Sequence, residues 1–277
     1  MKAQRITMKT STSVRRATAR FVLSASLAAL LAACATQSPT PSRIPNQTAD
    51  ITWKDGLFSQ PLSLEHTRPG CRGECPTLKV QSLIFPGVPE LTSLIDRTLA
   101  DMTPVAGETQ PSYQTLQQFE TYYWNTAGPR DETLVSAEIR YANKALTVLE
   151  LGSWQYYTGA AHGNSTTQFL NWDNAAKRRL SLDDFLMPGA LPAYQKALQQ
   201  AHQQWMTQHP DAQHDMAGFQ RMWPFQPSKN AAITDAGLLV KYNAYEIAPY
   251  SSGQPELLIP YPALKGILRA NYLPPGI

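Results

Sequence analysis

The sequence lacks the short motifs that usually mark an enzyme. It contains no Gly-x-Ser-x-Gly, no Ser-x-x-Lys, no His-Glu-x-x-His and no glycine-rich phosphate-binding loop. Charged residues make up only 16% of its 277 positions, and it has only three cysteines, none of which is left as a nucleophile once their roles below are assigned. These absences argue against the familiar hydrolases, metalloproteases and nucleotide-binding enzymes.

The first 33 residues resemble a bacterial export signal. Six Lys and Arg residues and no acidic residue precede an apolar run from Phe21 to Ala33, which is too short to span a bilayer. The run ends in Leu-Ala-Ala-Cys34, which resembles the lipobox of bacterial lipoproteins and implies cleavage before Cys34 and acylation of that residue. The alternative is an ordinary secreted protein with an incidental cysteine. Translation could begin at Met1 or at Met8.

Removing this signal reverses the sign of the net charge. The formal charge of +3 comes from 24 basic and 21 acidic residues, and the six basic residues of the signal leave 18 against 21, or −3. The basicity therefore belongs mostly to the cleaved peptide and makes no case for nucleic-acid binding. The remaining 244 residues are enough for one large domain or two small ones.

Two cysteines remain after Cys34, in the run Cys71-Arg-Gly-Glu-Cys75. In an oxidising envelope we expect them to form a disulfide, with about 2 kcal/mol of loop-entropy stabilisation for so small a ring. A zinc site would need four ligands, and a redox pair would favour Cys-x-x-Cys spacing. We expect no metal and no cofactor.

Composition and apolar periodicity predict four segments, of which the last two contain both strands and helices. The segments are a signal peptide at 1–33, a flexible Thr/Ser/Pro/Gln-rich tether at 34–50, an N-terminal α/β subdomain at 51–130 and a C-terminal domain at 131–277. Helices are predicted at 89–102, 113–123, 191–205 and 261–269, and strands at 78–85, 134–141, 146–157, 165–172, 238–247 and 255–260.

Some polar residues invite chemical roles that their spacing does not favour. Adjacent Asp183 and Asp184 suggest acid–base catalysis, but such pairs more often cap a short helical turn, and we expect capping. His202, His209 and His214 are seven and five residues apart, which does not put three metal ligands on one helix face.

Two tyrosine- and glycine-bearing loops, at 158–164 and 248–253, are the best candidates for recognition. The first contains Gly159-Ala-Ala-His162-Gly163, whose glycines permit a tight turn and leave the imidazole unscreened. The second contains Ala-Pro-Tyr250-Ser-Ser-Gly253. Tyrosine with small residues gives rigid aromatic contact and adaptable polar groups, as recognition loops commonly do.

The two loops and their flanks resemble a known family. Two blocks are similar to the extracytoplasmic domain of RsiV-type anti-sigma factors. The first is Tyr-Tyr-Thr-Gly-Ala-Ala-His-Gly at 156–163, with Phe169, Asp173 and Leu-x-Leu-x-Asp-Phe at 180–185 nearby, and the second is Lys-Tyr-Asn-Ala-Tyr-Glu-Ile-Ala-Pro-Tyr at 241–250. That domain of unknown function also accompanies PdaC-type peptidoglycan deacetylases. The resemblance covers about 133–268. It implies an α+β fold, with an antiparallel sheet packed against a few helices and a smaller N-terminal α/β subdomain.

The resemblance also implies an envelope binding module, which in the RsiV type senses lysozyme by binding it. Here no transmembrane helix or deacetylase domain accompanies it, so we expect binding without an anti-sigma role. The implied ligand-binding residues are Tyr157, Gly159, His162, Gly163, Tyr245, Glu246, Tyr250 and Gly253.

We therefore expect a non-catalytic lipoprotein held to the membrane by its lipid anchor, with lysozyme, a similar muramidase or a peptidoglycan fragment as its partner. Ala35 after the lipidated cysteine implies, by resemblance to lipoprotein sorting rules, the outer membrane facing the periplasm. Two alternatives stay open. One is a cell-wall hydrolase or deacetylase-related enzyme using His162 with Glu246 or an aspartate. The other is a purely structural envelope protein.

Overall fold

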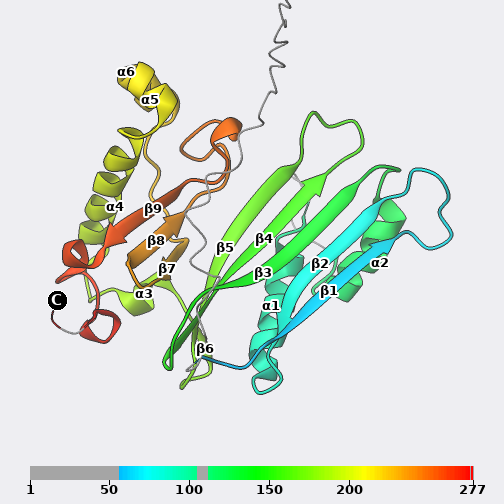
Figure 1. Ribbon diagram of the computed structural model, residues 1–277, viewed down its shortest axis with the longest axis horizontal. Coiled ribbons are helices and arrows are strands. Elements are labelled where there is room, and N and C mark those ends of the chain that lie inside the picture. Colours follow the sequence, from blue (N-terminus) through cyan, green and yellow to red (C-terminus); the bar gives the residue numbers. More distant parts are fainter. Residues whose placement is uncertain (1–55, 105–111, 275, 277) are drawn as a thin grey trace, which may run out of the picture. The chain divides into compact units, whose positions relative to one another are not determined.

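The computed structural model describes residues 56–104, 112–274 and 276. The predicted signal peptide, the lipidation site at Cys34 and the tether at 34–50 lie outside the described residues. The fold is α+β, as the sequence predicts, and consists of a six-stranded and a three-stranded sheet with their helices (Figure 1).

The larger sheet has its strands in sequence order. They are β1 (Gln60–Thr67), β2 (Thr77–Ile84), β3 (Glu132–Ala142), β4 (Leu146–Tyr156), β5 (Asn164–Asp173) and β6 (Arg178–Leu180). All neighbours are antiparallel except β2 and β3, which are parallel because two helices connect them. The sheet is therefore mixed, and it continues across the predicted boundary between 51–130 and 131–277.

Those two helices, α1 (Pro89–Asp101) and α2 (Leu116–Thr126), cover one face of the larger sheet (Figure 1). Proline at the first position suits the start of α1. The helix predicted from residue 113 begins later because the Thr115 side chain accepts a hydrogen bond from the Gln118 backbone N–H and caps it. The core beneath includes Leu91, Ile95, Leu99, Phe119, Val135, Leu149, Leu151 and Leu170.

The smaller sheet, β7 (Ala231–Ile233), β8 (Gly237–Lys241) and β9 (Glu256–Pro260), packs against α4 (Leu191–Met206). This second core includes Tyr194, Leu198, Leu238, Val240, Tyr242, Leu257 and Ile259. The remaining helices are α3 (Leu182–Phe185), α5 (Pro210–His214) and α6 (Met216–Met222), with single 3₁₀ turns η2 (Tyr250–Ser252), η3 (Tyr261–Leu264) and η4 (Ala270–Tyr272).

Two predicted elements are shorter in the structure. The strand predicted to 247 ends at Lys241, because the backbone N–H of Asn243 turns to donate to the Glu246 carboxylate. The helix predicted over 261–269 is only η3, because Gly266 takes a left-handed conformation with φ of 74° and ends it.

A β-bulge corrects the predicted facing of β3. The alternation predicted Tyr141 on the same face as Val135 and Ile139, but the pairing with β4 shifts by one residue between Ile139 and Tyr141. Ile139 stays on the face of α1 and α2, whereas Tyr141 packs against the core of the smaller sheet. The bulge thus puts Arg140 and Tyr141 on the side of the smaller sheet.

Four charged side chains join the two sheets at this bulge, and we call them the ionic joint. Arg140 on β3 lies 3.2 Å from carboxylate oxygens of both Glu150 on β4 and Glu256 on β9. Lys241 on β8 contacts the same two carboxylates, at 3.0 Å from Glu256. The four side chains are only 11–26% exposed, so each charge depends on its partners for compensation.

Two asparagines complete the connection along the open edge of β5. The Asn230 carboxamide accepts from the Phe169 backbone N–H at 2.7 Å and donates to the Thr167 and Lys241 carbonyls. Asn243 accepts from the Thr167 N–H at 2.8 Å. These side chains satisfy backbone groups that β6 does not reach, since β6 pairs only with residues 171–173 of β5.

The predicted disulfide and the predicted cap are both confirmed. Cys71 and Cys75 are bonded in the connection between β1 and β2. Asp184 accepts hydrogen bonds from the backbone N–H and hydroxyl of Ser181, which forms a capping box at the start of α3. These bonds, together with Arg178, lower the pKa of Asp184 to about 2.

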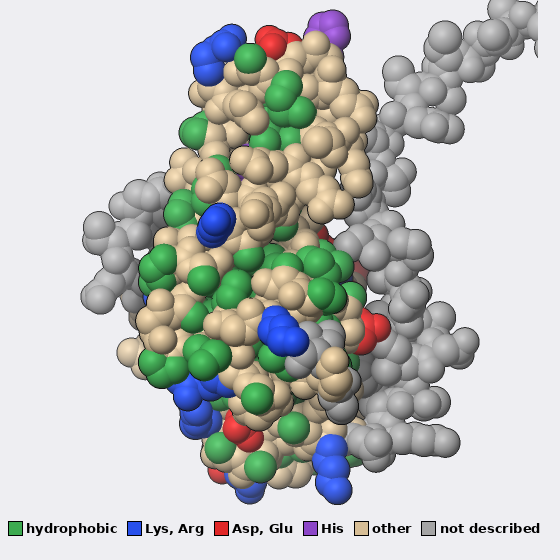
Figure 2. Space-filling view, turned by 90° about the vertical axis from the view of Figure 1, so that its left-hand side faces the viewer, with side chains coloured by type: hydrophobic (Ala, Val, Ile, Leu, Met, Phe, Trp, Pro, Cys, Tyr) green, Lys and Arg blue, Asp and Glu red, His purple; other side chains and the backbone are tan. Residues whose placement is uncertain are grey.

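The side of the molecule that carries α4 shows isolated charged side chains of both signs among uncharged ones (Figure 2). Among the described residues, the longest apolar helical stretches fall short of what is needed to cross a bilayer.

Replacing Lys241 with Met tests the ionic joint. Glu150 and Glu256 would keep only Arg140 between them, so we expect the free energy of unfolding to fall by about 3 kcal/mol. The matched control is Lys229→Met, because Lys229 pairs with Asp183 where both side chains are 63% exposed. There the loss should stay within about 0.5 kcal/mol. Equal losses in urea denaturation of the two variants would contradict the role given to the joint.

Candidate functional site

The two candidate loops meet in space although about 80 residues separate them. The imidazole of His162 stacks on the ring of Tyr250, with 4.0 Å between centroids. The Tyr250 hydroxyl donates to the Gly163 carbonyl at 2.9 Å, and the Tyr245 hydroxyl lies 3.4 Å from His162 Nε2. Both loops lie toward the upper end of the molecule in Figure 1.

The end of α6 extends this cluster. The ring of Trp223 lies 6.3 Å from that of Tyr245, and Met222 beside it is 72% exposed. We call His162, Met222, Trp223, Tyr245 and Tyr250 the aromatic face. Met222 and Trp223 had no functional role in the sequence-based prediction, because only the fold brings this short helix beside the second loop.

The first loop is anchored at its base by a buried aspartate. The Asp131 carboxylate accepts from the Thr158 backbone N–H at 2.6 Å, from its hydroxyl at 2.7 Å and from the Gly128 N–H at 2.8 Å. Burial raises the pKa of Asp131, but these hydrogen bonds outweigh it and hold the pKa below its ordinary value. The chain then reverses at Gly159, where φ is 91°.

Gly163 is required where the first loop re-enters the sheet. A Cβ atom at this position would lie 2.4–2.7 Å from three atoms of the Trp154 indole. The backbone therefore rests directly on the indole, and its carbonyl is held by Tyr250 and by His162 Nδ1 at 2.9 Å. Only glycine allows this close approach.

The second loop holds Tyr245 in an unusual conformation. Tyr245 has φ of 70°, a left-handed conformation that costs a non-glycine residue about 1–2 kcal/mol. The turn before it is fixed by Asn243, whose backbone N–H and carboxamide both donate to Glu246. The tyrosine ring nevertheless stays 52% exposed, so the strain is not repaid by burying it.

A histidine from the α4–α5 connection supports the same loop. His209 Nε2 lies 2.8 Å from the Ser252 hydroxyl, and its ring lies 4.7 Å from Phe219 and 4.9 Å from Trp205. His209 thus has a positioning role. Sequence spacing alone considered it only as a metal ligand.

The eight predicted ligand-binding residues fall into two groups. His162, Gly163, Tyr245 and Tyr250 come together in the aromatic face or directly beneath it. The other four shape the loops: Tyr157 and Gly159 lie by the Asp131 anchor, Glu246 closes the turn at Asn243, and Gly253, with φ of 67°, ends η2.

The contacts of His162 are with groups of the two loops themselves. Its two ring nitrogens face the Gly163 carbonyl and the Tyr245 hydroxyl. Within the described ranges, no hydrogen bond joins it to Glu246, whose acceptors serve Asn243. The structure, where it is described, also brings no three His, Cys, Asp or Glu side chains together as a metal site.

The fold and the loops define an α+β domain of a family known from sequence and from solved structures. A family described as "Protein of unknown function (DUF3298)" matches residues 183–262, which include the second loop. A crystal structure of a DUF3298 family protein from Pseudomonas aeruginosa PAO1 is 37% identical, with a TM-score of 0.72, covering 79% of this chain and 98% of that one.

The chain belongs to the DUF3298 family. A family member from Bacteroides fragilis NCTC 9343 is 21% identical over 78% of this chain and 96% of that one, with a TM-score of 0.60, and this likeness concerns the fold alone. No curated protein matches the chain.

Acidification should destabilise the protein through two histidines, one within α4 and one directly after it. Burial lowers the pKa of both His202 and His209. The unfolded chain therefore binds more protons than the folded one once the pH drops below about 6.5, so the free energy of unfolding is highest above that value and falls below it. Asp184 titrates far lower, outside this window.

Urea denaturation between pH 8 and pH 5 measures this effect. His202 is 2% exposed and stacks with Trp205 and Phe225, so His202→Phe keeps its shape while removing its titration. We expect the variant to show a shallower loss of stability with falling pH. The same loss as in the unchanged protein would contradict the assignment to His202.

Proposed function

We propose that this chain is a non-catalytic binding module of the bacterial cell envelope, whose aromatic face takes a lysozyme-type muramidase or a peptidoglycan fragment. The observation that carries the proposal is the meeting of the two distant loops in one exposed cluster built around His162, Tyr245 and Tyr250. The resemblance of both loops to RsiV-type domains supports a ligand of the cell wall or an enzyme that attacks it.

The composition of the face supports recognition. Binding sites are enriched in Tyr, Trp and Met, and the rigid rings of Tyr and Trp bury large areas at little cost in side-chain entropy. Here two such side chains are mostly exposed, Met222 at 72% and Tyr245 at 52%. Exposed side chains of this kind, grouped beside the second loop at the end of α6, are typical of an interaction surface.

The same geometry favours binding over catalysis. A general base needs a nucleophile or an orienting group within hydrogen-bond reach. His162 instead stacks on Tyr250 and contacts a backbone carbonyl, and Glu246 is occupied by its own turn. The hydroxyl of Ser252 is close to His209, but that imidazole lies against Trp205 and Phe219 and supports the loop.

We further propose that the module is lipid-anchored through Cys34 at the outer membrane, facing the periplasm. The lipobox-like run before Cys34 and the Ala35 that follows it support this assignment. Labelling with a radioactive or clickable fatty acid tests it directly, since Cys34→Ser should abolish the label.

Replacing Tyr245 with Gly separates binding from stability. Glycine relieves the left-handed strain while removing the exposed ring, so the free energy of unfolding should stay within about 1 kcal/mol of the unchanged protein. Binding should weaken at least thirtyfold, or about 2 kcal/mol, because Tyr245 lies centrally in the face. The measurement is calorimetry or a pull-down with hen lysozyme and with purified peptidoglycan.

The matched control is Phe58→Ala. Phe58 is also an exposed aromatic residue, at 70%, but it precedes β1 at the far edge of the larger sheet from β5. This variant should bind as the unchanged protein does. If the unchanged protein binds neither lysozyme nor peptidoglycan, the proposed function is overturned.

A further inference from the structure

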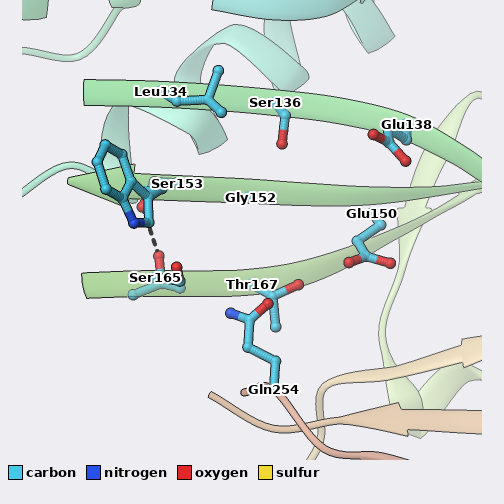
Figure 3. Close-up of a pocket in the computed structure, with 11 residues that line it drawn as sticks. Leu134, Ser136, Glu138, Glu150, Gly152, Ser153, Ser165, Thr167 and Gln254 are labelled. Carbon is cyan, nitrogen blue, oxygen red and sulfur yellow. Dashed lines mark hydrogen bonds between the residues drawn. The ribbon is translucent and has the colours of Figure 1, made fainter. Parts of the chain in front are cut away.

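A polar cavity of about 180 Å³ lies on the face of the larger sheet that α1 and α2 leave open (Figure 3). Side chains of β3, β4 and β5 form its floor, and Gln254 approaches from the loop before β9. Gly152 at the centre of the floor keeps the space open, because a Cβ there would lie 2.9 Å from the Ser136 hydroxyl. The half-buried indole of Trp154 belongs to the same lining.

Polar groups in this cavity lack partners. The carboxamide nitrogen of Gln254 is buried and, among the described residues, has no hydrogen-bond partner. Leaving such a donor unsatisfied costs about 1–3 kcal/mol, so its retention indicates a ligand or ordered water there. Across the cavity, the Glu138 side chain is exposed and forms no ion pair within the described ranges.

The position of Glu138 lowers the stability of the sheet. Glu138 lies directly opposite Glu150 in the β3–β4 register, and like charges in that position destabilise a sheet. The ionic joint compensates Glu150 through Arg140 and Lys241. It leaves Glu138 facing the cavity without an ion pair among the described residues, on the opposite side of the cavity from the Gln254 amide.

The charges select the ligand class. No Lys or Arg of the described part of the chain lines the cavity, so its lining does not favour a phosphate or another anion. A metal ion would need a third acidic or histidine ligand, which the described residues do not supply. Hydroxyl groups, by contrast, both donate and accept, so one hydroxyl of a ligand can donate to Glu138 while another accepts from Gln254. A ligand with several hydroxyls and one apolar face to lie on an indole fits this lining.

We propose that this cavity is a carbohydrate subsite that takes one pyranose ring of a glycan. The proposal rests on the proposed function and deepens it, because it names a glycan as a ligand of the module. Gly163, which lies on the Trp154 indole, connects the cavity to the aromatic face. A glycan seated in the cavity can therefore extend toward the tyrosines without leaving the protein surface.

Chitotriose, the trimer of N-acetylglucosamine, is the probe. Its dissociation constant for the purified full chain is measured by titration calorimetry or by ligand-observed NMR. We expect Glu138→Gln and Gln254→Leu each to weaken binding about tenfold, since the first replaces a charged acceptor with a weaker neutral one and the second removes a hydrogen-bond donor to the sugar. The matched control is Glu132→Gln, on the same strand and the same face as Glu138 but outside the cavity lining.

The outcomes separate this proposal from the proposed function. Weakening in both cavity variants, with Glu132→Gln unchanged, supports the subsite. Absence of chitotriose binding to the unchanged protein overturns it, while retained binding of lysozyme leaves the aromatic face in place. Binding that Tyr245→Gly abolishes but both cavity variants leave unchanged also overturns it. Thermal unfolding checks that each variant is folded. If Gln254→Leu does not fold, Glu138→Gln still tests the proposal, because Glu138 is at an exposed position.

Discussion

The ionic joint fixes how the two sheets are placed relative to each other. Its charged groups are stable at their low exposure only while all of them are paired. Two positive and two negative side chains alternate in the ionic joint, and none is more than 26% exposed. An apolar contact would hold the sheets together as well, but it would not fix their register. Because the ion pairs are directional and come from four strands, they allow only one placement of the smaller sheet against the larger one. The carboxamides of Asn230 and Asn243 add further hydrogen bonds between the two along β5.

This fixed placement is what assembles the aromatic face. The first loop belongs to the β4–β5 hairpin of the larger sheet, and the second follows β8 of the smaller one. A slip between the sheets would separate the rings of His162 and Tyr250, whose centroids lie 4.0 Å apart. Asn243 shows the coupling in one residue, since it holds the edge of β5 with its side chain and starts the turn that leads to Tyr245.

Much of this fold follows from the sequence, because alternation and helical spacing report burial on one element at a time. The strands at β2, β4 and β5 and the helices α1 and α4 were predictable for that reason, as was the cap at Asp184. The facing of Tyr141 was not, because a bulge has no signature in the alternation. Neither was the part that Trp223 plays, since it depends on contacts between segments far apart in the chain.

The same distinction explains why the loops can be predicted from the sequence whereas the cavity cannot. Tyrosine and glycine in a short loop are recognisable by composition, whereas Glu138, Gly152 and Gln254 each have an ordinary place in a strand or turn. They become notable only through what surrounds them: a carboxylate opposite another carboxylate, a glycine under a hydroxyl and a buried amide for which the described residues supply no acceptor. The opposed carboxylates and the unsatisfied amide each lower stability, and a ligand that hydrogen-bonded to both Glu138 and Gln254 would recover part of that loss.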